Sequence, residues 1–116
     1  MTVSTVGNTV EAVSLIVPTI ATKSSSYTLV LGDADNDIIE MDNGGTLTIP
    51  TNASVPFLTG TQIMLVQTGA SQVTVAGVGG VTVNATPGLK LRAQWSSATL
   101  MKRDTNTWLL TGDLSA

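Results

Sequence analysis

Acidic residues at alternate positions form the segment of this chain that most resembles a metal-binding loop. The segment Asp33–Asp37 has the sequence Asp-Ala-Asp-Asn-Asp. An EF-hand calcium loop that began at Asp33 would require glycine at its sixth position and glutamate at its twelfth. Ile38 and Gly44 occupy those positions. We therefore predict an Asx-rich turn between two strands, and no metal site.

The residues required for several common kinds of catalysis are absent. The chain has no cysteine and no histidine, which excludes thiol nucleophiles, serine–histidine triads and HExxH zinc sites. Two carboxylates can hydrolyse a glycosidic bond, but no pair of acids is marked out for that role and aromatic residues are only 3% of the chain. The segment Gly77–Gly80 lacks the lysine and the helix of a phosphate-binding loop. We expect a non-enzymatic protein with no catalytic residue and no cofactor.

Length and composition predict one domain that is unusually apolar at its surface. The chain has 116 residues, of which 42% are hydrophobic and only 11% charged. This excess of apolar residues indicates that other subunits cover part of the surface. The net charge of -3 argues against nucleic-acid binding, which needs a basic surface.

The apolar segment Ala12–Ala21 is too short to span a bilayer, and Pro18 interrupts it. No lysine or arginine precedes this segment, so the basic start of a signal peptide is missing. We expect synthesis in a cytoplasm without export, and no membrane partner.

The most informative stretch is Leu89–Gly112. It contains both tryptophans and four of the five basic residues. Its first part alternates apolar and polar residues, which predicts a half-buried strand over Lys90–Trp95. Asp104-Thr105-Asn106 predicts a hairpin loop between two further strands. Five of the eight acids lie between Asp33 and Asp42. Such segregated charges fit either two solvated faces or ion pairs between adjacent strands or subunits, and we favour pairing between subunits.

Alternating apolar and β-branched residues predict nine strands in the body of the chain. No helical pattern separates them, so we predict an all-β fold, an antiparallel, jelly-roll-like β-sandwich. No fixed repeat appears, which argues against a β-solenoid. The predicted strands are Tyr27–Leu31, Asp37–Met41, Thr46–Ile49, Gln62–Thr68, Gln72–Ala76, Val81–Asn84, Lys90–Trp95, Ala98–Arg103 and Thr107–Thr111.

Two of these strands are apolar on both faces. They are Ile63–Val66 and Trp108–Leu110. A two-layer sandwich covers only one face of each sheet, so the second face needs another cover, and the simplest cover is a second copy. We expect core and subunit contacts from Ile63, Leu65, Trp108, Leu109 and Leu110.

Residues 1–23 differ from the body and are predicted to form an N-terminal arm, with the β-sandwich domain spanning residues 24–116. Apolar residues recur at spacings of three and four, which would suit a short helix, and Asn8 with Glu11 could cap it. Gly7, Pro18 and many β-branched residues oppose a helix, so an extended arm is our first expectation.

Several short segments, in this order, resemble a β-rich module of tailed bacteriophages. This module occurs at the distal end of tail fibres and tailspikes and in small capsid-decorating (cement) proteins. The resemblance extends from about Ser24 to the C-terminus, and it implies a β-sandwich that trimerises. The segments that carry it are Thr48–Val55, Gly60–Ile63, Leu89–Trp95, Asn106–Trp108 and Gly112–Leu114.

Within that family we expect a capsid cement protein, because the body follows only 23 residues after Met1, whereas a fibre tip normally follows a long shaft. Its partners would be two further copies and the major capsid protein of a phage head, on the outer surface of the virion. The alternative is a distal receptor-binding module that recognises host surface glycans, with Trp95 as a possible contact. The residues expected to contact the capsid are Val3, Val6, Val10, Val13, Leu15 and Ile16.

Overall fold

The computed structural model describes residues 2–6, 9–14, 17–34 and 38–116, and side chains from residue 17 onward within these ranges. These residues form strands and one short 3-10 helix, and contain no α-helix. The elements are β1 Thr2–Val6, β2 Thr9–Ser14, β3 Ile20–Lys23, β4 Tyr27–Thr28, η1 Leu31–Ala34, β5 Ile38–Met41, β6 Gly45–Ile49, β7 Gln62–Gln67, β8 Val73–Gly77, β9 Thr82–Ala85, β10 Lys90–Leu91, β11 Ser97–Asp104, β12 Thr107–Gly112 and β13 Leu114–Ser115.

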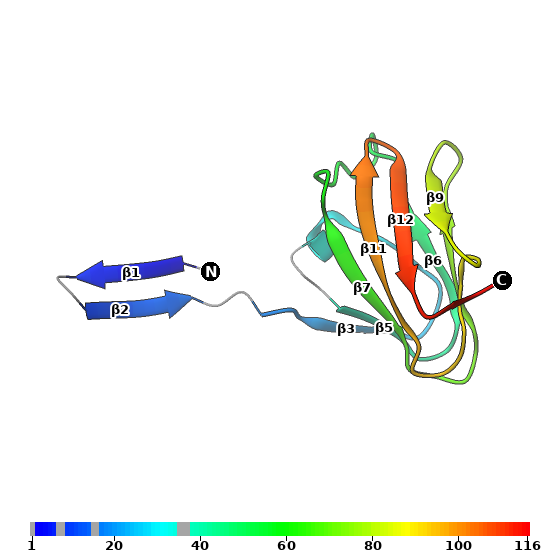
Figure 1. The fold of residues 1–116 in the computed structure, drawn as a ribbon, viewed down its shortest axis with the longest axis horizontal. Coiled ribbons are helices and arrows are strands. Elements are labelled where there is room, and N and C mark those ends of the chain that lie inside the picture. Colours follow the sequence, from blue (N-terminus) through cyan, green and yellow to red (C-terminus); the bar gives the residue numbers. More distant parts are fainter. Residues whose placement is uncertain (1, 7–8, 15–16, 35–37) are drawn as a thin grey trace.

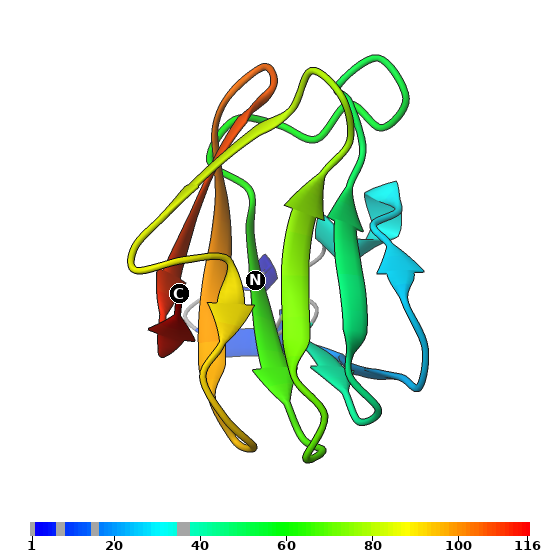
Figure 2. The same ribbon diagram turned by 90° about the vertical axis from the view of Figure 1, so that its right-hand side faces the viewer.

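Two sheets pack face to face and form the body, which confirms the predicted all-β sandwich. The six-stranded sheet has the order β3-β5-β7-β11-β12-β9, and the five-stranded sheet has the order β13-β10-β8-β6-β4. Figure 2 looks onto the five-stranded sheet, with the central strands β6 and β8 side by side. No helix in the described part of the chain is long and apolar enough to cross a membrane.

The pairing of the strands corrects the prediction of an antiparallel fold. Antiparallel pairing holds for β7–β11–β12 and for β8–β10–β13. The series β3–β5–β7 and β4–β6–β8 are parallel, and β9 is parallel to β12. From β3 to β8 the chain passes alternately between the two sheets. A jelly-roll-like topology is not shown by these pairings.

This alternation means that residues 20–77 wind as a solenoid does, which our argument against a β-solenoid had not anticipated. Each circuit places one strand in each sheet, so every strand lies beside the strand of the next circuit. The circuits are unequal in length, since Ile20 pairs with Ile38 and Ile38 pairs with Met64. The absence of a fixed repeat was therefore real, but it did not exclude this winding.

The interior of the sandwich is filled by aliphatic side chains from both sheets. Trp108 is the largest buried residue and is 1% exposed. Its ring meets the edge of Phe57 in a T-shaped contact, with centroids 5.5 Å apart, a geometry that aromatic pairs favour. The other fully buried apolar side chains include Leu29, Ile39, Met41, Leu47, Ile49, Ile63, Leu65, Leu91, Leu100 and Leu110.

The N-terminal segment forms an antiparallel hairpin of β1 and β2, in which Val3 pairs with Val13. The expectation of extended chain is confirmed for these strands, and the helical alternative was wrong. The hairpin is a separate two-stranded sheet and projects to one side of the sandwich (Figure 1). The following strand β3 pairs with β5, so the body sheet includes Ile20–Lys23, which we had assigned to the arm.

Candidate functional site

The residues expected to contact the capsid lie on the hairpin or beyond it. Val3 and Val6 belong to β1, and Val10 and Val13 belong to β2. The hairpin therefore brings these four positions into one small sheet. The remaining two expected residues, Leu15 and Ile16, lie outside the described residues.

The residues expected to supply core and subunit contacts separate into two groups. Ile63, Leu65, Trp108 and Leu110 face the interior and are at most 1% exposed, so they form core. Leu109 alternates with its buried neighbours on β12 and is half-buried. Only Leu109 of the five is therefore placed to meet another molecule.

Outward positions of the six-stranded sheet include polar residues, such as Glu40, Thr99 and Thr111, and five apolar residues. On β7 these are Met64, which is 42% exposed, and the half-buried Val66. Ile38 on β5 pairs with Met64, and Met101 on β11 pairs with Leu109 on β12. We call the five residues Ile38, Met64, Val66, Met101 and Leu109 the apolar face.

The opposite outer face is polar. Outward positions on the central strands of the five-stranded sheet are Thr46, Thr48, Thr74 and Ala76, and they are half-buried. We call these four positions the threonine face. Threonine suits a pleated surface in contact with water. The outer face of the six-stranded sheet therefore carries more large apolar side chains than the outer face of the five-stranded sheet.

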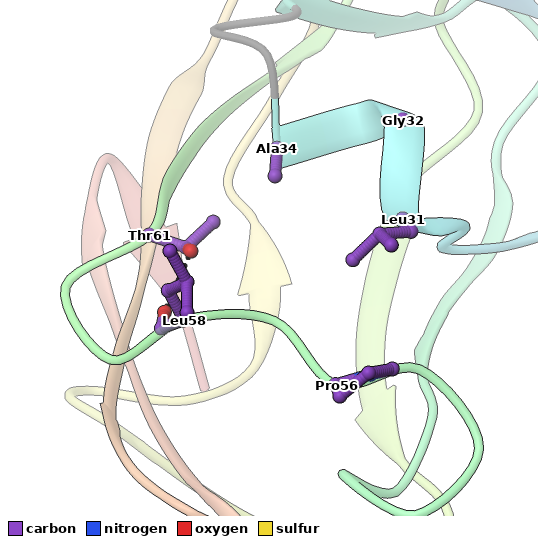
Figure 3. Close-up of a pocket in the computed structure, with 6 residues that line it drawn as sticks. All are labelled: Leu31, Gly32, Ala34, Pro56, Leu58 and Thr61. Atoms are coloured by element: carbon purple, nitrogen blue, oxygen red, sulfur yellow. Dashed lines mark hydrogen bonds between the residues drawn. The ribbon is translucent and has the colours of Figure 1, made fainter.

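An apolar hollow lies at the edge of the body, between η1 and the loop that precedes β7 (Figure 3). Its volume is about 620 Å³, and no charged residue lines it. Leu31 on η1 and Leu58 on the loop are 54% and 81% exposed. This site could not be predicted from the sequence, because its two walls are far apart in the chain. Its lining is Leu31, Gly32, Ala34, Pro56, Leu58 and Thr61.

Asp33 has a structural role, as the prediction of an Asx-rich turn requires. It is 4% exposed, and its carboxylate accepts hydrogen bonds from the Tyr27 hydroxyl at 2.9 Å and from the Val30 backbone N–H at 2.8 Å. These contacts fix η1. Residues 35–37 lie outside the described residues, and the residues that the structure does describe hold no cluster of three or more potential metal ligands.

Lys102 is buried, although we had interpreted the bases of the stretch Leu89–Gly112 as members of ion pairs with the acidic segment. It is 2% exposed, and its ammonium group donates to Asn52 Oδ1 at 2.6 Å and to the Phe57 carbonyl at 2.7 Å. Burial lowers the pKa of Lys102 below its ordinary value of 10.5, because desolvation disfavours the charged form. The side chain fastens the loop before β7 to strand β11.

Among the described residues, Arg92 and Asp113 form an ion pair. The pair is bidentate, with Nε 2.7 Å from Oδ1 and Nη2 2.9 Å from Oδ2. The hydrogen bond from Arg92 and a second one from Ser96 lower the pKa of Asp113. This pair joins two loops of the same subunit, and it does not involve the acidic segment to which we had expected the bases to pair.

Trp95 lies outside the core and is 71% exposed. It was expected at the end of a strand, but β10 ends at Leu91 and Trp95 lies in the loop between β10 and β11. Its φ of 71° is the only positive value for a non-glycine residue in the described part of the chain. Sequence alternation could not reveal this turn, because the residue type that normally marks it, glycine, is absent.

The arrangement offers several surfaces for binding. The hairpin, the apolar face, the hollow and the exposed indole of Trp95 are the features that a partner could contact. Comparisons of the chain with protein-family models, with curated proteins and with solved structures found no match.

Proposed function

We propose that the protein is a structural component of a tailed-phage virion, a trimeric cement protein that binds the outer surface of the head. The observation that carries the proposal is the β1–β2 hairpin, which forms a sheet of its own at one side of the sandwich (Figure 1). A two-stranded hairpin is at best marginally stable alone in water. A hairpin of this kind needs a surface to bind.

The proposed surface is the major capsid protein. The sequence of the arm carries apolar residues at Val3, Val6, Val10, Val13, Leu15 and Ile16. Docking of this arm would bury apolar area. Each Å² of apolar surface removed from water would stabilise the complex by roughly 25 cal/mol. A protein that binds the assembled shell and not its separated parts stabilises the shell by mass action. The role is non-enzymatic and requires no nucleic acid, membrane or cofactor.

The apolar face supports the proposal of a trimer. Met64 and Leu109 lie on the outside of a sheet whose other face already covers the core. An exposed apolar patch of this kind marks an interaction site in soluble proteins. Three copies that packed through this face would leave three hairpins free to bind one shell. In this proposal Leu109 retains its role in subunit contact, whereas Ile63, Leu65, Trp108 and Leu110 stabilise the fold.

The test compares the full chain with a variant that lacks residues 1–16. This deletion keeps β3, which the earlier boundary at residue 23 would have removed from the body sheet. We expect the shortened protein to remain folded, as judged by circular dichroism. It should no longer sediment together with capsids that lack the protein. A folded shortened protein that still saturates capsids would contradict the role of the arm.

The second candidate is a receptor-binding module at the distal end of a tail fibre or tailspike, and exposed Trp95 favours it. Electron microscopy of labelled virions separates the two functions. Many copies distributed over the head support the cement function, and a few copies at the tail support receptor binding. In both cases the protein belongs to a virion assembled in the bacterial cytoplasm.

A further inference from the structure

The corner at which the chain passes from β5 to β6 is only three residues long, with the sequence Asp42-Asn43-Gly44. The two strands that it joins belong to different sheets. Hydrogen bonds connect this corner to its neighbours on both sides. The Asp42 N–H donates to the Lys23 carbonyl at 3.2 Å, and the Thr68 N–H donates to the Met41 carbonyl at 3.0 Å. The corner is therefore held between the previous circuit of the chain and the next one.

Gly44 has no room for a side chain at this corner. Its φ of 66° is a left-handed value that glycine adopts without steric cost. A Cβ atom on Gly44 would lie 2.8 Å from the Cβ atom of Ser71 and 3.1 Å from the Gln72 carbonyl oxygen. Both neighbours belong to the corner that precedes β8. The packing of successive circuits therefore requires glycine directly after Asn43.

Asn43 itself is exposed, and few contacts restrain it. Its side-chain amide donates to the Ser24 carbonyl at 3.3 Å, which is longer than most hydrogen bonds of this kind. The Gly44 backbone N–H donates no hydrogen bond within the described part of the chain. Water can thus reach the Asn43 amide, and no acceptor holds the proton on the nitrogen that follows it.

The other asparagines that the structure describes differ from Asn43. The Asn52 N–H donates to Asn106 Oδ1 at 2.9 Å, and Asn52 Oδ1 accepts from Lys102. Asn84 lies within strand β9. Each of these three asparagines precedes alanine or threonine, whose Cβ atom hinders the approach of its backbone nitrogen to the asparagine side chain. Asn43-Gly44 is the only Asn-Gly pair in the sequence.

We propose that Asn43 is a site of spontaneous deamidation in the folded protein, with water as the second reactant. The Gly44 nitrogen loses its proton and attacks Cγ of Asn43, so a cyclic succinimide forms, the Cγ–Nδ2 bond breaks and ammonia leaves. Water then opens the ring at either of its carbonyl groups. Opening at the former side-chain carbonyl gives aspartate. Opening at the former backbone carbonyl gives isoaspartate, in which the main chain runs through Cγ.

Both products change the corner. Each places a new carboxylate beside Asp42 and removes the amide that donates to Ser24. Isoaspartate also lengthens the main chain by one atom, in a corner that neighbouring circuits confine on both sides. We expect the corner to loosen as the protein ages. This reaction does not depend on whether the protein binds a shell or other copies.

The experiment incubates the full folded chain in mildly alkaline buffer, with a parallel sample unfolded in urea as the positive control. Peptide mass spectrometry measures the replacement of each side-chain amide by a carboxylate, and enzymatic methylation of isoaspartate identifies that product. In the folded protein Asn43 should react faster than Asn84 and Asn106 by about tenfold or more, which corresponds to at least about 1.4 kcal/mol in activation free energy.

Asn43→Gln is the matched control variant. It keeps a side-chain amide, but its cyclic intermediate would need a larger ring that forms slowly, so this position should stay unmodified. Asn43→Asp adds the charge alone. It should stay folded and melt at a higher temperature than the isoaspartate form, which ion-exchange chromatography separates from the unreacted protein.

Two results would overturn the proposal. It is wrong if the folded protein keeps the Asn43 amide after the unfolded sample has lost it, or if neither sample loses it, since the corner or the sequence would then protect this residue. It is also wrong if Asn84 or Asn106 reacts as fast as Asn43 in the folded protein, because the exposed Asn-Gly corner would then select nothing.

Discussion

At the scale of single residues, Lys102 shows how a charge can be used inside an apolar sandwich. Its ammonium group has two oxygen acceptors, Asn52 Oδ1 and the Phe57 carbonyl, and no carboxylate partner in the described part of the chain. Hydrogen bonds to a charged group contribute about 1.5–3 kcal/mol each. They offset part of the desolvation cost that lowers the pKa of the lysine.

We predict that Lys102→Met destabilises the protein by about 1–3 kcal/mol at pH 7, because the Phe57 carbonyl and the Asn52 amide lose their buried donor. Because the folded-state pKa of Lys102 is lowered, the unfolded chain holds this proton at pH values where the folded chain has released it. The contribution of Lys102 to the free energy of unfolding therefore increases with pH up to about 10.5. Urea denaturation between pH 7 and 10 should show this rise in the parent relative to Lys102→Met.

The matched control is Lys90→Met, which changes an exposed lysine on β10. It should alter the free energy of unfolding by less than about 0.5 kcal/mol. Equal stabilities of Lys102→Met and Lys90→Met would show that the loop before β7 does not depend on the buried ammonium group.

Trp95 allows the backbone strain to be measured separately from any ligand. Trp95→Gly and Trp95→Ala both remove the indole, but only glycine adopts a φ of 71° without a steric cost. We predict that Trp95→Gly is more stable than Trp95→Ala by about 1 kcal/mol, since left-handed backbone costs an L-residue roughly 1–2 kcal/mol. At the exposed Thr111 on β12 the order should reverse, because glycine weakens a strand. Chemical denaturation of all four variants tests both statements.

At the scale of elements, the ion pair of Arg92 and Asp113 joins the β10–β11 loop to the β12–β13 loop. The Arg92 backbone N–H also donates to the Asp113 carbonyl at 3.1 Å, and the Asp113 N–H donates to the Ser97 carbonyl at 3.0 Å. Both loops pass from one sheet to the other. The pair thus helps to hold the two sheets together where these two loops cross between them.

We predict that the stabilising effect of the Asp113 carboxylate is lost in acid. Its pKa is lowered in the folded state, so it stabilises the fold above the ordinary pKa near 3.8, and the effect disappears as the pH falls through the lowered value. The melting temperature of Asp113→Asn should lie below that of the parent at pH 7, and the difference should shrink toward pH 2. A difference that is constant with pH would show that charge plays no part.

The sequence predicted where most strands lie but not their direction. Alternation of apolar and polar residues gave β6, β7, β8, β9, β11 and β12 to within about two residues, because it depends only on which face is buried. The same alternation occurs in parallel and antiparallel strands, so the winding of residues 20–77 could not be deduced. The predicted strand Lys90–Trp95 failed after Leu91 because its turn is imposed by Gln67 and Asp113, which are remote in sequence.

The candidate site was predictable only in part for the same reason. The strands predicted to be apolar on both sides do carry outward apolar residues, which are Met64 and Val66 on β7 and Leu109 on β12, but polar residues also face outward on both strands. Sequence alone could not say which alternate residues faced outward, so four core residues were taken as possible contacts and Met64 was not. A shift of one residue exchanges the two faces of a strand.

At the scale of the whole molecule, the described residues extend over 56 × 31 × 23 Å, and the hairpin lies at one end of the long axis (Figure 1). The apolar face belongs to the six-stranded sheet, and the threonine face belongs to the five-stranded sheet. The proposed shell contact and the proposed contact between copies therefore lie on separate surfaces. A trimer that decorates a shell requires this separation, because the same residues cannot contact both.

This separation leads to the prediction that tests the subunit contact. Met64→Asp places a charge at the centre of the apolar face, where it would lose its hydration when copies associate, and desolvation of an unpaired charge costs several kcal/mol. We expect light scattering to show a trimer for the parent and a monomer for Met64→Asp. Met64 is 42% exposed, so the monomer should stay folded. Thr74→Asp, on the threonine face, is the control and should remain trimeric. A parent that is monomeric at high concentration, or dissociation by Thr74→Asp alone, would contradict the assignment of this face.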